Sequence, residues 1–281
     1  MKTEESEEYW NSVALEARNK EALRVKKWKR VARNWLAEYA DKRANDFLFD
    51  VVENIIALNG SARVLDVGCG PGKWTRYFAG RGSRVTAIDV SSEMIVLAKE
   101  SVFKEGLTNV DFHVMDISEL SLPKNTYDLV NCVTVLQHIL DDEKWKKAVK
   151  NMTSVTKKRG KILLFETAPD FVIKKRTPHM RLTSMKQYIK EFENAKTRLI
   201  YWRAADLSLP ITFFGLKNYA ASFNKRIYYF LAGKPPQFSV DFLSFLSRIA
   251  TVLAEPIDYR FGQTPLGLLS FGRIMLFEKI A

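Results

Sequence analysis

Cysteine and histidine are scarce in this 281-residue sequence. Cys69 and Cys132 are the two cysteines, too few for a disulfide framework or a cysteine-rich metal site. The three histidines, His113, His138 and His179, do not have the spacing of metal ligands, so no metal is expected. No stretch of 18 uninterrupted apolar residues is present, which excludes a predicted transmembrane segment. The acidic amino-terminus does not resemble a signal peptide, and we therefore expect a cytoplasmic protein.

Acidic residues are in short supply at one end of the sequence. The chain has 44 basic and 32 acidic residues, a net charge of +12. Residues 171–281 hold 17 basic and 7 acidic residues, which is +10 of that +12, and they contain 19 of the 34 aromatic residues. Two interpretations are open: a solvated basic face over an ordinary core, or a surface for an anionic partner.

From residue 61 onward, apolar β-branched runs alternate with helical patterns. Strands are predicted at Arg63–Val67, Arg84–Asp89, Val110–Met115, Asp128–Val133, Lys161–Phe165, Leu199–Trp202 and Arg273–Glu278. Helices are predicted near Lys73–Gly80, Ser92–Glu105, Asp142–Lys157 and Ser184–Asn194. Such alternation implies a doubly wound α/β fold, in which helices cover both faces of a mostly parallel sheet.

The regions outside this alternation are predicted to be helical. Residues 1–60 form an N-terminal helical cap, whose second helix is expected to stop at Asn59-Gly60. Apolar residues at helical spacing predict a helical lid insertion at 206–262, before the last strand. Residues 61–205 plus 263–281 are then left as the α/β domain.

The strongest local motif is a glycine-rich turn between a predicted strand and a predicted helix, Val64-Leu65-Asp66-Val67-Gly68-Cys69-Gly70-Pro71-Gly72. Glycines let the backbone turn tightly and approach a ligand, and a following helix offers N–H groups to an anion. A nicotinamide dinucleotide site has a further glycine where this chain has Lys73, so pyrophosphate binding is disfavoured.

Acidic residues end the next two predicted strands. Asp89 lies 21 residues after Gly68, which places its carboxylate beside the glycine turn of a doubly wound sheet. There it can accept hydrogen bonds from both hydroxyls of a ribose. Asp116 ends the third strand and can accept from an adenine amino group. Each acid alone is typical of a turn or helix cap. The glycine turn, Asp89 and Asp116 in this order, however, point to an adenosine site.

In order, these segments resemble the motifs of class I S-adenosylmethionine-dependent methyltransferases. The resemblance rests on residues 64–72, Ala87-Ile88-Asp89, Met115-Asp116-Ile117, Tyr127-Asp128-Leu129-Val130 and Leu136-Gln137-His138. It covers roughly residues 45–205 and 267–281. It implies a seven-stranded, mostly parallel sheet with an antiparallel last strand. It also implies that S-adenosyl-L-methionine is the cofactor and S-adenosyl-L-homocysteine the product.

The resemblance assigns the methionine and ribose parts of the cofactor to the first two strands. Gly68, Cys69 and Gly70 would lie alongside the methionine part, and Asp66 would support that turn. Asp89 would hold the ribose.

The adenine and the sulfonium are assigned in the same way. Val90 and Met94 would lie against the adenine face, while Asp116 and the backbone of Ile117 would read the adenine edge. Val133, just past the fourth strand, would lie under the sulfonium.

The acceptor side is less sharply specified by the resemblance. Tyr39 and Arg43 occupy roughly the place of a helix that caps the cofactor, and Arg43 is either a partner for the cofactor carboxylate or a surface arginine. His138 is the best-placed general base, needed only if the acceptor must lose a proton. Glu166 is a weaker candidate base, expected to face the mouth of the crevice. His179 lies in a basic stretch and is a candidate for lining an acceptor pocket.

Three functions remain open on the sequence. A lid with aromatic and basic residues favours methyl transfer to a small or amphiphilic acceptor, anionic or lipid-like, which allows peripheral contact with a membrane. Basic charge interleaved with aromatics also suits an RNA methyltransferase, although no RNA-binding module is recognisable. The third is a non-catalytic, cofactor-binding scaffold. The acceptor atom and the oligomeric state stay open.

Overall fold

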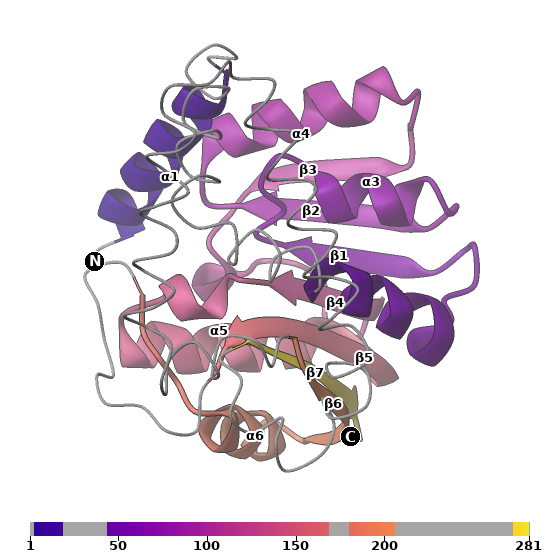
Figure 1. The fold of residues 1–281 in the computed structure, drawn as a ribbon, viewed down its shortest axis with the longest axis vertical. Helices are drawn as coiled ribbons and strands as arrows, with labels where there is room; N and C mark the ends of the chain where they lie inside the picture. Colours follow the sequence, from indigo (N-terminus) through magenta and orange to yellow (C-terminus); the bar gives the residue numbers. More distant parts are fainter. Residues whose placement is uncertain (1–2, 19–43, 169–179, 206–271, 281) are drawn as a thin grey trace, which may run out of the picture. The chain divides into compact units, whose positions relative to one another are not determined.

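The computed structural model describes residues 3–18, 44–168, 180–205 and 272–280 (Figure 1). The chain divides into two compact units. The first contains Met1–Leu15, Val51–Trp202 and Arg273–Ala281, and the second contains Glu16–Asp50 and Arg203–Gly272. The predicted lid at 206–262 lies outside the described residues, and so do residues 19–43 of the predicted N-terminal cap. Strands β1 to β5 and the residues that line the cavity discussed below belong to the first unit.

Seven strands form one sheet in the order β3-β2-β1-β4-β5-β7-β6 (Figure 1). The strands are β1 (Arg63–Val67), β2 (Arg84–Asp89), β3 (Val110–Val114), β4 (Tyr127–Val133), β5 (Thr156–Thr167), β6 (Thr197–Ala204) and β7 (Gly272–Lys279). The pairs β1–β2, β1–β4, β2–β3 and β4–β5 are parallel. The last strand is antiparallel: Ile280 N–H donates to Lys196 O (3.0 Å), and Ala205 N–H donates to Gly272 O (2.9 Å). The predicted fold class is confirmed.

The helices alternate with these strands as the sequence predicts. They are α1 (Thr3–Arg18), α3 (Lys73–Ala79), α4 (Ser92–Lys104), α5 (Asp142–Val155) and α6 (Met185–Asn194). A π-helical segment, η1 (Val51–Ile56), and two 3-10 turns, η2 (Ile117–Glu119) and η3 (Leu136–His138), accompany them. Side-chain caps fix three of their starts. Ser91 accepts from Met94 N–H, Asp141 from Lys144 N–H, and Ser184 from Gln187 N–H.

Two predicted helix ends are wrong. The helix expected to stop at Asn59-Gly60 ends at Ile56, because Ala57 adopts a left-handed backbone (φ 49°) that no helix continues. The helix expected to reach residue 157 ends at Val155. Thr156 already pairs with β4, so β5 starts five residues earlier than the apolar pattern indicates.

The main core lies around β4, β5, α5 and α6. Phe192 of α6 is fully buried there and stacks on Phe277 of β7, with ring centroids 4.5 Å apart. This stack joins the last helix to the last strand, so it attaches the antiparallel end of the sheet to the rest of the core.

Replacing Phe192 with alanine should therefore lower the free energy of unfolding by about 3–5 kcal/mol, because the change leaves a cavity in packed core. Phe103→Ala is the matched control, since Phe103 is 84% exposed. It should change stability by less than about 0.5 kcal/mol. Urea denaturation of both variants measures the difference, and equal effects would contradict this assignment of the core.

Candidate functional site

A cavity of about 300 Å³ opens where β1, β2 and β4 end. Ten of the residues that the sequence singles out line it: Gly68, Cys69, Gly70, Asp89, Val90, Met94, Asp116, Ile117, Val133 and His138. Asp66 lies behind the cavity wall, with 2% of its surface exposed. Tyr39, Arg43 and His179 lie outside the described residues.

Helix α1 supplies a wall that the sequence reasoning missed. Ser6 and Trp10 both line the cavity. Asn11 holds the helix there, because its Oδ1 accepts from Ser91 Oγ (2.6 Å) and from Glu93 N–H (3.4 Å) at the start of α4. The only sequence signal was a tryptophan inside a strongly polar helix, which by itself does not point to a cavity.

The turn after β1 requires glycine at two positions. Gly68 has φ 61°, and a Cβ at that position would collide with Cγ2 of Val135. Gly72 has φ 85°, and a Cβ there would lie 3.1 Å from the Cα of Ala98 in α4. The left-handed backbone and the two close approaches are therefore possible only without a side chain.

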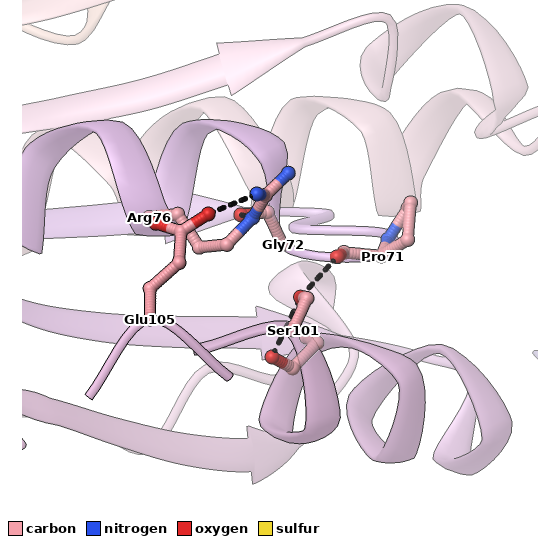
Figure 2. A network of polar contacts seen from close by, with 6 residues as sticks. Pro71, Gly72, Arg76, Ser101 and Glu105 are labelled. Carbon is pink, nitrogen blue, oxygen red and sulfur yellow. Dashed lines mark hydrogen bonds and ion pairs between the residues drawn. The ribbon is translucent and has the colours of Figure 1, made fainter. Parts of the chain in front are cut away.

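Polar contacts attach the end of this turn to α4 (Figure 2). Ser101 Oγ donates to the carbonyl of Pro71 at 2.8 Å. Arg76 Nε donates to the carbonyl of Gly72 at 3.3 Å, and the same guanidinium pairs with Glu105. These contacts fix the start of α3 relative to the wall formed by β2 and α4.

Asp89 connects the glycine turn to the tip of β2. Its Oδ2 accepts from Gly70 N–H and its Oδ1 from Ser91 N–H, each at 2.9 Å. Burial raises the pKa of this carboxyl, and the two N–H donors oppose that rise. Each carboxylate oxygen can accept a second bond. Asp89 can therefore hold the turn and still accept from a hydroxyl in the cavity.

Asp116 is the cap of a short helical turn and also lines the cavity. Its Oδ1 accepts from Ser118 N–H at 2.8 Å, which makes it the cap of η2. Ile117 and Met94 of α4 line the same cavity. The cap is shown by these contacts, and the expected role of Asp116 in reading an adenine edge stays a prediction.

Asp66 supports the turn from behind. Its two oxygens accept from Thr75 Oγ1 (2.6 Å) and from Asn131 Nδ2 (2.8 Å), which links β1 to α3 and β4. Burial raises the pKa of Asp66 to about 6, since desolvation outweighs these two hydrogen bonds.

His138 lines the cavity from the segment that follows β4. Its ring meets Trp10 of α1 edge to face, with centroids 5.1 Å apart. The Gln137 amide is oriented by Thr167 N–H, which donates to its Oε1 at 2.8 Å, so its Nε2 points to His138 Nε2 at 3.3 Å. Because an amide nitrogen only donates, this contact is a hydrogen bond in the tautomer that carries its proton on Nδ1 and accepts on Nε2.

Glu166 does not face the crevice mouth, and that expectation is wrong. Its side chain is fully buried beneath the segment after β4. One oxygen accepts from Val135 N–H (2.9 Å) and Leu136 N–H (2.8 Å), and the other from Gln137 N–H (3.0 Å). Burial raises the pKa of Glu166, whereas the three N–H donors favour its ionised form. Glu166 is too enclosed to act as a base on a ligand.

Both cysteine side chains are buried. Cys132 is fully buried on β4, as expected, and burial raises the pKa of both Cys132 and Cys69. Within the described ranges, no cluster of three metal-binding side chains occurs. Over the same ranges, no helix is both long and apolar enough to cross a membrane.

The strand order, the glycine turn after β1 and the acid at the tip of β2 together define a doubly wound, Rossmann-like fold. Residues 64–160 match the profile of a family described as a methyltransferase domain. This part of the chain is therefore similar to a methyltransferase domain. The residues around the cavity fit S-adenosylmethionine, because carboxylates at two strand tips and a glycine turn line it together with apolar side chains.

Curated relatives match part of the chain. A protein of Coxiella burnetii named ubiquinone biosynthesis O-methyltransferase is 34% identical over 116 residues, which cover 41% of this chain and 47% of the relative. A protein of the same name from Xanthomonas campestris is 37% identical over 98 residues, covering 34% of this chain and 40% of that one. The chain thus matches about half the length of these relatives or less.

Solved structures share the fold at low identity. A methyltransferase from Methanosarcina mazei superposes with a TM-score of 0.54 at 18% identity, covering 82% of this chain and 97% of its own. The [4+2]-cyclase SpnF has the same TM-score at 21% identity, covering 83% and 80%. A cyclase among these neighbours illustrates that the fold alone does not define the reaction.

Stability should depend on pH through Asp66. The folded pKa of about 6 lies above the ordinary value of 3.8, so the folded state holds a proton that the unfolded state releases. The resulting stabilisation is full below about pH 4 and is lost as pH rises through 6, a change of up to about 3 kcal/mol. In Asp66→Asn this loss should be absent.

Denaturation between pH 4 and 7.5 measures the free energy of unfolding of the wild-type protein and of Asp66→Asn. The variant should fold, because the Asn131 amide can turn over and present Oδ1, which has no hydrogen-bond partner among the described residues. Parallel pH profiles for the two proteins would contradict the assignment.

Proposed function

We propose that this protein transfers a methyl group from S-adenosylmethionine to a hydroxyl oxygen of a small or amphiphilic acceptor. One observation carries the proposal: the glycine turn, Asp89 and His138 line the same cavity. The names of the curated relatives, which are O-methyltransferases, support an oxygen acceptor.

The cofactor would lie along the first two strands. Gly68, Cys69 and Gly70 would lie alongside its methionine part, and Asp89 would hold its ribose. When bound, it supplies an activated methyl group. The chain's own task is then to hold an acceptor in line with that group and to keep water away.

The adenine end has its own residues in this proposal. Val90 and Met94 would lie against the adenine face, and Asp116 with Ile117 would read its edge. Val133, at the end of β4, would lie under the sulfonium. All five residues line the same cavity, which supports their assignment to one ligand.

His138 would take the proton of the acceptor hydroxyl on Nε2. The contact from Gln137 to that nitrogen is long, at 3.3 Å, so a hydroxyl that replaces it gives up little. Trp10 packs on the ring and closes the cavity on the side of α1. A base is useful here because a neutral hydroxyl is a weak nucleophile until its proton leaves.

The acceptor's chemical class is proposed from the same wall. Trp10, Val135 and Ile139 offer apolar surface, while Lys144 adds one positive charge to a cavity that is also lined by Asp89, Asp116 and Asp141. We therefore favour an apolar or amphiphilic acceptor. The lid at 206–262 and the cap residues Tyr39 and Arg43 remain predictions. RNA as acceptor is not proposed, because that hypothesis depends on a basic region that lies mostly outside the described residues.

Transfer of label from tritiated S-adenosylmethionine tests the function. The protein should transfer label into the organic extract of a bacterial lysate, and ribonuclease treatment should leave that label in place. His138→Asn should lower the initial rate by about 100-fold or more, with the affinity for S-adenosylhomocysteine unchanged.

His113→Asn is the matched control, because His113 is exposed on the edge strand β3 and should leave the rate unchanged. Label that ribonuclease removes would contradict the proposed acceptor. A wild-type rate in His138→Asn would contradict the proposed base. No transfer into any fraction, despite cofactor binding, would favour a scaffold.

A further inference from the structure

A buried carboxylate on β5 fixes the segment that carries His138. Glu166 accepts hydrogen bonds from three successive backbone N–H groups, those of Val135, Leu136 and Gln137. Its side chain has no exposed surface. The turn η3 has no side-chain cap of its own, so Glu166 satisfies the donors at its start from a neighbouring strand.

The same segment is attached at both of its ends. Thr134, with a left-handed backbone (φ 57°), donates its N–H to the carbonyl of Phe165 at 2.7 Å. The carbonyl of Gln137 accepts from Arg181 N–H at 2.8 Å. Between these two bonds, Glu166 accepts from the backbone N–H groups of all three middle residues.

This segment connects the glycine turn with His138. Val135 packs so closely on Gly68 that the glycine turn cannot accept a side chain there. His138 N–H donates to Val135 O at 2.9 Å, so the imidazole is one turn away from that contact. A shift of residues 135–137 would therefore change the distance between His138 and the glycine turn.

We propose that Glu166 is a positioning residue, which sets the place of His138 relative to the glycine turn and thereby the alignment of acceptor and methyl donor. The inference rests on the proposed function of His138 as the base. Misplacing a reacting group by about 1 Å can cost roughly 100-fold in rate. Glu166 would act only through the backbone, and it would not touch either ligand.

Glu166→Gln is the sharpest variant. The amide keeps the size of the side chain and retains one oxygen, which can still accept from Val135 and Leu136 N–H. Its NH₂ group, however, would face Gln137 N–H, donor against donor. The disturbance would therefore fall on Gln137 and on His138, the next residue.

Asp128→Asn is the matched control. Asp128 lies on the neighbouring strand β4 and also accepts from a backbone N–H, that of Arg63 at 2.9 Å. It lines a different hollow, which Lys157 and Arg159 also line. A change there tests whether loss of any acid from the sheet has the same effect.

Three readouts distinguish positioning from general stability: the rate of label transfer, the affinity for S-adenosylhomocysteine, and the NMR resonances of the His138 ring. The chain has three histidines, so the His138 signal is identified by its absence in His138→Asn. The nearby Trp10 ring makes this signal sensitive to small displacements.

In Glu166→Gln we expect the rate to fall by about 10- to 100-fold, the affinity to stay within about threefold, and the His138 signal to move. Asp128→Asn should leave all three readouts unchanged. An unmoved His138 signal, or equal losses of rate and affinity, would overturn the proposal. If the wild-type protein transfers no label, the proposed function fails, and the His138 signal alone then decides whether Glu166 positions the ring.

Discussion

The left-handed turn after β1 is the constraint on which the rest of the cavity depends. It turns the chain back beneath Val135 and directs Gly70 N–H to Asp89, so it is tied to both neighbouring strands. Glycine at position 68 is the residue that permits this approach. With the turn in place, the carboxyl ends of three parallel strands converge on one opening, as expected at the point where the strand order reverses.

Buried acids on two strands support the cavity from behind, while a third faces it. Asp66 joins β1 to α3 and β4, and Glu166 fixes the segment that follows β4. Burial destabilises the ionised form of both acids, and hydrogen-bond donors on each oxygen offset part of that cost. Asp89 accepts two hydrogen bonds from the protein, and its remaining lone pairs can accept from a ligand. The acids thus differ in role because they differ in what surrounds them.

The sequence alone predicts those strands and helices whose residues show a clear local pattern of apolar side chains. β1 and β2 have the predicted bounds, since continuous apolar runs there end at Val67 and at Asp89. Contacts between distant residues were not predictable in this way. Trp10 meets His138, and Glu166 meets Val135, only after the sheet has formed. Glu166 resembled a crevice acid because it ends a strand, but its side chain points under the neighbouring segment instead.

Hydrogen exchange with and without S-adenosylhomocysteine tests the central claim most directly. Binding in the cavity should protect backbone amides at residues 67–72, 88–94, 115–118 and 133–138, the segments that surround it. The amides at 157–161, which border the hollow near Asp128, should exchange at the same rate in both samples. Protection confined to that second region, or none at all at saturating ligand, would contradict the account.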